Sequence, residues 1–230
     1  MSLMQQTPAY DQYNETLLDM IPGGLKRIME VGCMRGTLAQ AYLQANPDCK
    51  WTGIDIDPDN IIQARSICNT VFCRDIEQIS ESELIQWSDT DAWIFGDTLE
   101  HLQDPWQVLT RIRRHMSNTT SIIASIPNAQ HWSFQARLNI GLFRYENDGL
   151  FDRTHLRFFT RTTIMELFET TGFHIENAVS RVFNFPGIEN YMPHIRAMAA
   201  ASGYDPDQAQ ADAIPYQYVV RALPTPVTIA

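Results

Sequence analysis

A glycine turn joins a short apolar segment to an amphipathic one near the start of this chain. Residues 26–31 have the pattern of a buried strand, and residues 36–45 have helical spacing with apolar residues on one face. Gly32 and Gly36 predict a tight turn between them, where a ligand can approach the backbone and free helix amides. A second predicted strand carries Asp55 at its end, roughly twenty residues on, placed to accept hydrogen bonds from ribose hydroxyls. Together these features predict a site for an adenosine-containing ligand.

The rest of the chain alternates between strand and helix patterns. Further strands are expected at 51–56, 71–74, 92–96, 121–126, 173–182 and 216–222, and further helices at 10–21, 58–67, 104–116 and 160–172. This alternation predicts a single α/β domain over residues 1–230. Its fold is expected to be Rossmann-like, with a mostly parallel seven-stranded sheet, helices on both faces and an antiparallel last strand. Residues 186–215 are less regular, with helical spacing around 195–201 and 207–213, and are interpreted as an insertion before that strand.

Composition excludes several classes of partner. The formal net charge of −10 argues against nucleic acid, because phosphate binding depends on clustered Lys and Arg. No apolar run is long enough to span a bilayer, so no membrane association is expected. None of the four cysteines forms a Cys-x-x-Cys pair or has a histidine at zinc-finger spacing. We therefore expect free thiols in a reduced, cytoplasmic protein, and no metal site.

Four motifs occur in unbroken order along the chain: MEVGCMRGTLAQAY, GIDIDP, FCRDIEQI and IFGDTLEHLQDPWQVL. They resemble the successive motifs of class I methyltransferases, which use S-adenosylmethionine, and the resemblance covers about residues 11–173. It implies a Rossmann-like fold, S-adenosylmethionine as the cofactor, and methyl transfer as the activity. In this family, the helix before the first strand often covers the cofactor as a lid, which implies that role for residues 10–21.

The resemblance also implies which residues bind the cofactor: Glu30, Gly32, Gly36, Asp55, Ile56, Asp75, Ile76, Asp97 and Thr98. The glycine turn, supported by Glu30, surrounds the methionine part, with Asp97 and Thr98 near it. Asp55 binds the ribose hydroxyls. Asp75 faces the adenine through its carboxylate, and the residue after it does so through its backbone amide.

Two other functions remain open on the same fold. An NAD-type oxidoreductase requires Gly-x-Gly-x-x-Gly, and this chain has Met34 and Thr37 at the second and third positions, which disfavours a pyrophosphate. A non-catalytic subunit that binds S-adenosylmethionine gains support from Met34, because many methyltransferases have glycine there. The series of carboxylates at the expected strand ends argues against such a subunit.

The acceptor is expected to meet the loops of residues 128–160, which follow the fifth strand. The stretches PNAQHW and GLFDRTHLRFFT resemble those of bacterial methyltransferases linked to glycan, cell-surface polysaccharide or small-metabolite modification. This resemblance implies a small-molecule acceptor, with a sugar hydroxyl as one candidate. A hydroxyl benefits from a general base, for which His131 and His155 are the candidates, with Asp152 as an orienting partner.

Several residues near this region also fit structural roles. His155, with Arg153 and Arg157, fits a contact that ties the loop to the following helix. Glu100 and His101 fit a capped loop before the helix that begins at Asp104. The following aromatic side chains fit either an acceptor pocket or a core: Trp132, Phe134, Phe143, Tyr145 and Phe151. A homodimer also stays open.

Overall fold

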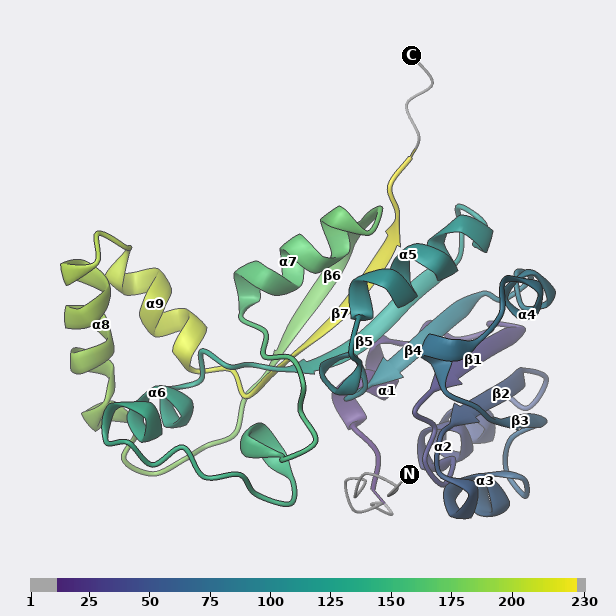
Figure 1. The fold of residues 1–230 in the computed structure, drawn as a ribbon, viewed down its shortest axis with the longest axis horizontal. Coiled ribbons are helices and arrows are strands. Elements are labelled where there is room, and N and C mark those ends of the chain that lie inside the picture. Colours follow the sequence, from purple (N-terminus) through teal and green to yellow (C-terminus); the bar gives the residue numbers. More distant parts are fainter. Residues whose placement is uncertain (1–11, 227–230) are drawn as a thin grey trace.

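A seven-stranded sheet forms the centre of the computed structural model, which describes residues 12–226. Its strands are β1 (Arg27–Val31), β2 (Lys50–Asp55), β3 (Thr70–Cys73), β4 (Ala92–Gly96), β5 (Ser121–Pro127), β6 (Phe173–Arg181) and β7 (Gln217–Pro224). Their order is β3-β2-β1-β4-β5-β7-β6, and the first five are parallel neighbours. β7 lies antiparallel between β5 and β6 (Figure 1), which confirms the predicted mixed sheet.

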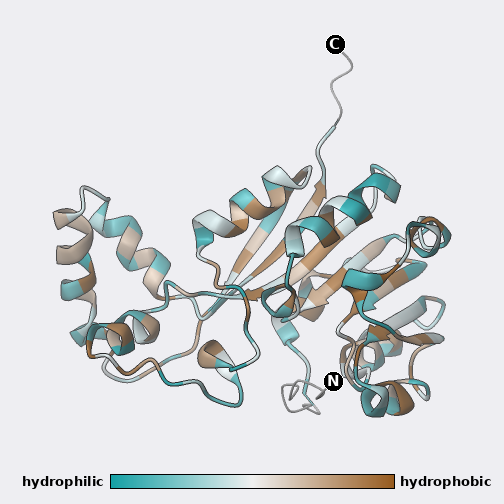
Figure 2. Cartoon of the chain, in the orientation of Figure 1, coloured by the Kyte–Doolittle hydropathy of each residue, from teal (hydrophilic) through white to brown (hydrophobic). Residues whose placement is uncertain are grey.

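Helices cover both faces of this sheet, as predicted. On one face lie α4 (Glu81–Gln86), α5 (Pro105–His115) and α7 (Arg161–Thr170), whose apolar residues join one core cluster. On the other lie α1 (Glu15–Met20), α2 (Thr37–Ala45) and α3 (Pro58–Ala64), which join a second cluster. Hydrophobic residues concentrate along the strands between these layers (Figure 2). The central strands β4 and β5 are buried along nearly their whole length, which explains their continuous apolar sequences.

A third group of helices stands beside the sheet (Figure 1). It consists of α6 (Trp132–Asn139), α8 (Met192–Ala201) and α9 (Pro206–Ala213). Ile195, Ala209 and Ala213 form its small core, against which Trp132 packs. The helices α8 and α9 lie in the predicted insertion, whereas α6 lies where the sequence predicts only a loop. Among residues 12–226, no helix has the length and apolar character needed to cross a bilayer.

Short 3-10 helices occupy four of the connections: η1 (Ile76–Gln78), η2 (Leu99–His101), η3 (Gly149–Phe151) and η4 (Ile188–Asn190). α4 was not predicted from the sequence, although Ser80 and Glu83 form a capping box at its start. α3 ends at Ala64, three residues before the predicted end at Ile67.

The N-terminal helix is shorter than the sequence predicts. The range 10–21 was expected, but α1 begins at Glu15 because the side chain of Asn14 accepts a hydrogen bond from the Leu17 amide at 3.2 Å and caps the helix. Residues 10 and 11 lie outside the described residues. Leu17 is buried against the second core cluster and also lines the cavity described below, so α1 lies beside the predicted cofactor site.

Candidate functional site

A cavity of about 640 Å³ opens at the carboxyl ends of the central strands. Its lining comes from the ends of β1, β2, β3 and β4, from the start of α1, from loop residues 152–156, and from residues 216–217 at the start of β7. β1 and β4 are neighbours at the point where the strand order reverses. Open α/β sheets bind ligands at this point, outside the carboxyl ends of the strands.

Most of the residues predicted to bind a cofactor line this one cavity: Glu30, Gly32, Asp55, Ile56, Asp75, Ile76, Asp97 and Thr98. Gly36 is not among the lining residues. It caps the start of α2 with a φ of 81°, a conformation that glycine adopts without strain. Gly36 therefore shapes the turn rather than facing the cavity.

The turn after β1 is held to the end of β2 by a hydrogen bond from a backbone amide to a side-chain carboxylate. The Met34 amide donates to Oδ2 of Asp55 at 2.8 Å. Met34 has a φ of 46°, in the left-handed region that favours glycine. Because the hydrogen bond uses only the backbone amide, a methionine can occupy this position. Its left-handed backbone is strained, and such strain is common at functional sites.

Asp55 is buried, and both of its carboxylate oxygens accept backbone hydrogen bonds. Oδ2 accepts from Met34 and Oδ1 accepts from the Asp57 amide at 2.8 Å. Burial raises the pKa of Asp55, while these amide bonds oppose the shift. Each carboxylate oxygen has lone pairs for about two hydrogen bonds, so Asp55 retains acceptor capacity toward the cavity.

Glu30 lies on β1 beneath the turn and is 4% exposed. Its Oε2 accepts a hydrogen bond from the Trp51 indole at 2.9 Å. Burial raises the pKa of Glu30 to about 8, and the Trp51 bond partly offsets this effect. The buried carboxyl therefore holds its proton more tightly in the folded chain than in the unfolded chain.

This shift predicts a pH-dependent stability. Because the folded pKa of Glu30 is about 8 and the unfolded value is 4.5, the stability that Glu30 contributes falls as pH rises through that window. The limiting slope is roughly 1.4 kcal/mol per pH unit. Glu30→Gln keeps an oxygen for Trp51 and does not titrate, so its stability relative to the unmodified chain should rise from about pH 5 to about pH 8. Urea unfolding of both proteins at each pH measures this difference, and parallel pH dependences would contradict the assignment.

Asp97, at the end of β4, is positioned by two distant strands. Its Oδ1 accepts from the Ser125 hydroxyl of β5 at 3.0 Å and from Nε2 of Gln217 of β7 at 2.7 Å. Its φ of 48° is again left-handed, and burial raises its pKa to about 6. Gln217 was not predicted as a site residue, because it lies 120 positions from Asp97 in the sequence.

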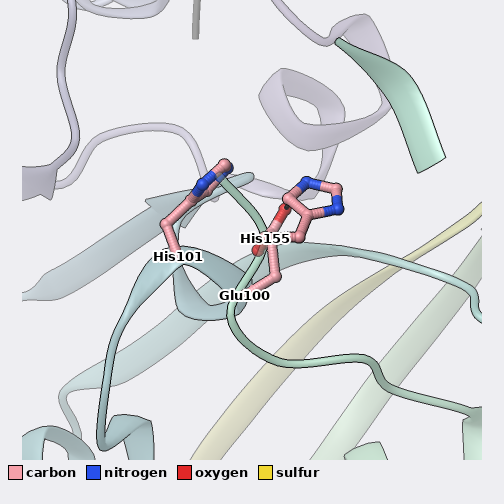
Figure 3. A group of neighbouring side chains, drawn as sticks. All are labelled: Glu100, His101 and His155. Carbon is pink, nitrogen blue, oxygen red and sulfur yellow. Dashed lines mark ion pairs between the residues drawn. The ribbon is translucent and has the colours of Figure 1, made fainter. Parts of the chain in front are cut away.

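Glu100, His101 and His155 are neighbouring side chains (Figure 3), and all three line the same cavity. Oε1 of Glu100 lies 4.0 Å from Nε2 of His155, and the two imidazole centroids are 4.8 Å apart. Glu100 is 1% exposed, and burial, reinforced by the charge of Asp97, raises its pKa well above the usual value. Burial lowers the pKa of His155 to about 4. The sequence favours a capped loop for Glu100 and His101, whereas the structure places both in the cavity lining.

His131 lies outside the cavity lining, although the sequence predicts it as a catalytic candidate. Its Nδ1 is 2.8 Å from the Ser133 hydroxyl at the start of α6, where His131 is the N-cap. The ring is 1% exposed and packs against the rings of Trp132, Phe185 and Tyr216. The chain turns into α6 directly after β5, and this turn carries His131 away from the cavity.

The aromatic residues expected in an acceptor pocket mostly pack with one another. Phe134 and Phe151 stack with centroids 4.8 Å apart, and Phe143 packs against both. These three form a small separate core. Trp132 belongs to the core of the α6, α8 and α9 group, and Tyr145 is exposed. Tyr216, which was not predicted, lines the cavity instead.

Comparison with known proteins places these features in a family. A family model described as a methyltransferase domain matches residues 6–178. A search of curated protein sequences found no match. Among solved structures, the chain resembles a SAM-dependent methyltransferase from Archaeoglobus fulgidus, with 17% identity, a TM-score of 0.57, and 87% of this chain and 86% of that chain covered.

Two further structures show how widely the fold is used. Magnesium protoporphyrin IX methyltransferase from Synechocystis, solved with bound SAH, has 14% identity and a TM-score of 0.59, covering 92% of this chain and 81% of that chain. The cyclase SpnF has 16% identity and a TM-score of 0.58, covering 92% and 79%. Such low identities show the fold alone, and one fold can serve many acceptors.

Proposed function

This chain belongs to the class I methyltransferases that use S-adenosylmethionine, and we propose that it methylates a hydroxyl group of a small molecule such as a sugar. The observation that carries the proposal is one cavity lined by two different groups of side chains. One group consists of the carboxylates and the glycine turn at the ends of β1 to β3, which we assign to the cofactor end. The other is the cluster of Glu100, His101 and His155, which we assign to the acceptor end.

We place S-adenosylmethionine along the edge formed by the strand ends. The methionine part lies at the turn of Gly32, above Glu30, the ribose at Asp55, and the adenine at Asp75 and Ile76. The order of β3, β2 and β1 in the sheet supports this path, because it places these residues side by side in the same sequence as the parts of the cofactor. The reactive methyl group then lies near Asp97, at the end of β4.

The acceptor enters at the far side of Asp97. Methyl transfer is a displacement in which the acceptor oxygen bonds to the methyl carbon while the carbon–sulfur bond breaks, so the enzyme must align three atoms. His155 takes the role of the acceptor-side catalytic residue, in preference to His131, because His155 lines the cavity and His131 does not. Polar groups around the acceptor end suit a hydroxyl-rich molecule better than an apolar one.

The non-catalytic alternative has less support from the site. A subunit that only binds the cofactor needs no polar acceptor end, whereas this cavity contains a buried Glu100 carboxyl with no hydrogen-bond partner among the described residues. The oxidoreductase alternative is disfavoured by the family match and by the methionine at the second glycine position.

The cellular compartment is proposed from the cysteines. All four are free, and Cys33, Cys49 and Cys68 are buried, with burial raising the pKa of each thiol. Buried thiols with raised pKa are poorly reactive, and free cysteines are typical of reducing compartments. These features support a location in the cytoplasm.

Calorimetric titration with S-adenosylhomocysteine, followed by transfer of a labelled methyl group to a panel of sugars and hydroxylated metabolites, tests the function. His155→Asn is expected to lower turnover by about 100-fold or more while leaving S-adenosylhomocysteine affinity within a few-fold. His131→Asn is the matched control, because asparagine can still cap α6, and it should retain turnover.

Three outcomes would contradict parts of this assignment. Absence of S-adenosylhomocysteine binding would remove the proposed cofactor path. Full turnover in His155→Asn would move the acceptor end elsewhere. A fall in turnover in a stably folded His131→Asn would restore His131 to the mechanism.

A further inference from the structure

Glu100 presents an unusual electrostatic feature. Its side chain is almost completely buried, and neither carboxylate oxygen has a hydrogen-bond partner among the residues that the structure describes. Buried polar groups in proteins are nearly always satisfied, and an exception often marks the place of an ion or a water molecule. Leaving a carboxyl group buried and unpaired costs free energy, so the site is arranged for something that Glu100 binds.

The backbone fixes Glu100 against the loop that carries His155. The amides of Leu156 and Arg157 donate to the Glu100 carbonyl oxygen at 2.8 and 2.9 Å. This pairing holds η2 beside residues 152–157. Glu100, His101 and His155 can each contribute one ligand atom, and these atoms lie within 4.8 Å of one another. The three side chains lie next to one another (Figure 3).

Neighbouring groups determine which nitrogen of His101 carries the proton. Nδ1 lies 3.2 Å from the Thr154 carbonyl oxygen, which can only accept, so Nδ1 carries the proton and donates. The Thr154 hydroxyl is 3.0 Å from the same Nδ1 and donates to Asp152 Oδ1 at 2.7 Å. This series of hydrogen bonds leaves Nε2 of His101 with a free lone pair. Histidines that bind metals are oriented in the same way, by donating their other ring N–H to a carbonyl or carboxylate.

His155 is held beside Glu100 by burial. Its side chain is 6% exposed, and its Nε2 faces Oε1 of Glu100 at 4.0 Å. Two imidazoles and one carboxylate are the donor set of catalytic zinc sites and of several iron(II) sites, which keep further positions open for substrate.

We propose that Glu100, His101 and His155 bind a divalent transition-metal ion at the acceptor end of the cavity. The separation of 4.0 Å between Glu100 and His155 is close to the spacing that such an ion requires. Ligands about 2.1 Å from a tetrahedral ion lie about 3.4 Å apart, so the pair must approach by roughly half an ångström. Side-chain rotation can supply a change of this size without moving the backbone.

This site deepens the proposed function and rests on it. The ion binds the acceptor hydroxyl, lowers its pKa and holds the oxygen in line with the methyl group. The hydroxyl proton leaves to water, the oxygen bonds to the methyl carbon, and the carbon–sulfur electron pair stays on sulfur. The products are the methyl ether, S-adenosylhomocysteine and one proton. A sugar with two adjacent hydroxyls suits the open positions of the ion.

Titration with Co²⁺ tests the site directly. We expect one ion per chain, with visible absorption typical of nitrogen and oxygen ligands and without the intense band of a cobalt thiolate. Glu100→Gln and His155→Asn should weaken cobalt binding by at least about 100-fold. Thr154→Val keeps the carbonyl oxygen beside Nδ1 of His101 and removes the hydroxyl that links His101 to Asp152, so it should weaken cobalt binding by about 10-fold.

Matched controls come from a carboxylate–imidazole pair outside the cavity. Nε2 of His115 lies 2.7 Å from Oε2 of Glu81, and both residues are partly exposed. Glu81→Gln and His115→Asn should bind cobalt as tightly as the unmodified chain. Titration with S-adenosylhomocysteine on every sample shows that each variant keeps a folded cofactor site.

The two titrations separate the possible outcomes. S-adenosylhomocysteine binding without a cobalt signal overturns the metal site and leaves the proposed methyl transfer intact. The metal site is also overturned if Glu81→Gln weakens cobalt binding as much as Glu100→Gln does. A cobalt–thiolate absorption band would overturn it as well. If Glu100→Gln does not fold, the Thr154→Val variant and removal of cobalt by a chelator from the unmodified chain decide the matter. A chelator should abolish methyl transfer and leave S-adenosylhomocysteine affinity unchanged.

Discussion

Asp55→Ala is expected to reduce the affinity for S-adenosylhomocysteine by at least about 100-fold. A carboxylate that accepts two ribose hydroxyl bonds contributes roughly 1.5–3 kcal/mol for each, and about 1.4 kcal/mol corresponds to a factor of ten. Asp55 also receives the amides of Met34 and Asp57, each at 2.8 Å. The alanine variant therefore loses the ribose contacts and also releases the turn that surrounds the methionine part.

Asp55→Asn is not a mild substitution at this position. Both carboxylate oxygens face amide donors, so an asparagine must point its NH₂ group at one of them. Asp57→Asn provides the matched control, because its side chain caps α3 and lies outside the cavity lining. Calorimetric titration gives the affinities, and thermal unfolding shows whether each variant is folded. A folded Asp55→Ala chain that binds within a few-fold of the unmodified affinity would remove Asp55 from the ribose site.

Gly32→Ala is expected to destabilise the fold by roughly 2–5 kcal/mol and to weaken cofactor binding strongly. Gly32 has a φ of 73°, and a Cβ atom there would lie 2.6 Å from Oγ1 of Thr98. Thr98 has little freedom to move, since its hydroxyl lies 3.0 Å from the carbonyl oxygens of both Val31 and Gly96. The alanine variant therefore combines backbone strain with a clash between the ends of β1 and β4.

Two further variants separate these effects. Gly24 has a similar φ of 78°, and nothing lies within 4 Å of a Cβ atom built there, so Gly24→Ala measures backbone strain alone at about 1–2 kcal/mol. Combining Gly32→Ala with Thr98→Ala removes the clash. The double variant should therefore regain the free energy of unfolding that Gly32→Ala loses beyond the loss in Gly24→Ala. Urea unfolding gives the free energies, and equal losses in Gly24→Ala and Gly32→Ala would show that the contact with Thr98 costs nothing.

The sheet could be predicted because each element has a local pattern. The apolar strands, the Asp104 and Thr160 helix caps, and the final antiparallel pair are all visible within short windows of sequence. Errors arose where a local signal was weak or misleading. α1 begins at Glu15 because of the Asn14 cap, although the apolar spacing extends further toward the N-terminus. α6 was missed because a histidine, an unusual capping residue, begins it.

The grouping of the predicted cofactor residues could also be anticipated, although they come from the ends of four strands. In a parallel sheet all carboxyl ends meet at one edge, so residues that directly follow the strands become neighbours once the strand order is known. Asp55 and Asp75 follow β2 and β3 in this way, and Asp97 follows β4. Four motifs in the right order therefore sufficed to place them in one cavity.

The sequence by itself determined the α/β class, the mixed sheet and the carboxylates that gather in one cavity, because periodicity and strand ends are local properties. Only the tertiary structure decided which histidine lines that cavity. It placed His131 in a core beside α6 and brought His155 against Glu100 through amide bonds that join residues more than fifty positions apart. Such pairing and burial depend on how loops cross the sheet edge, and no local spacing encodes that path. For the same reason the four local motifs indicate the cofactor, whereas the contacts among Glu100, His101 and His155 could be found only in the folded chain.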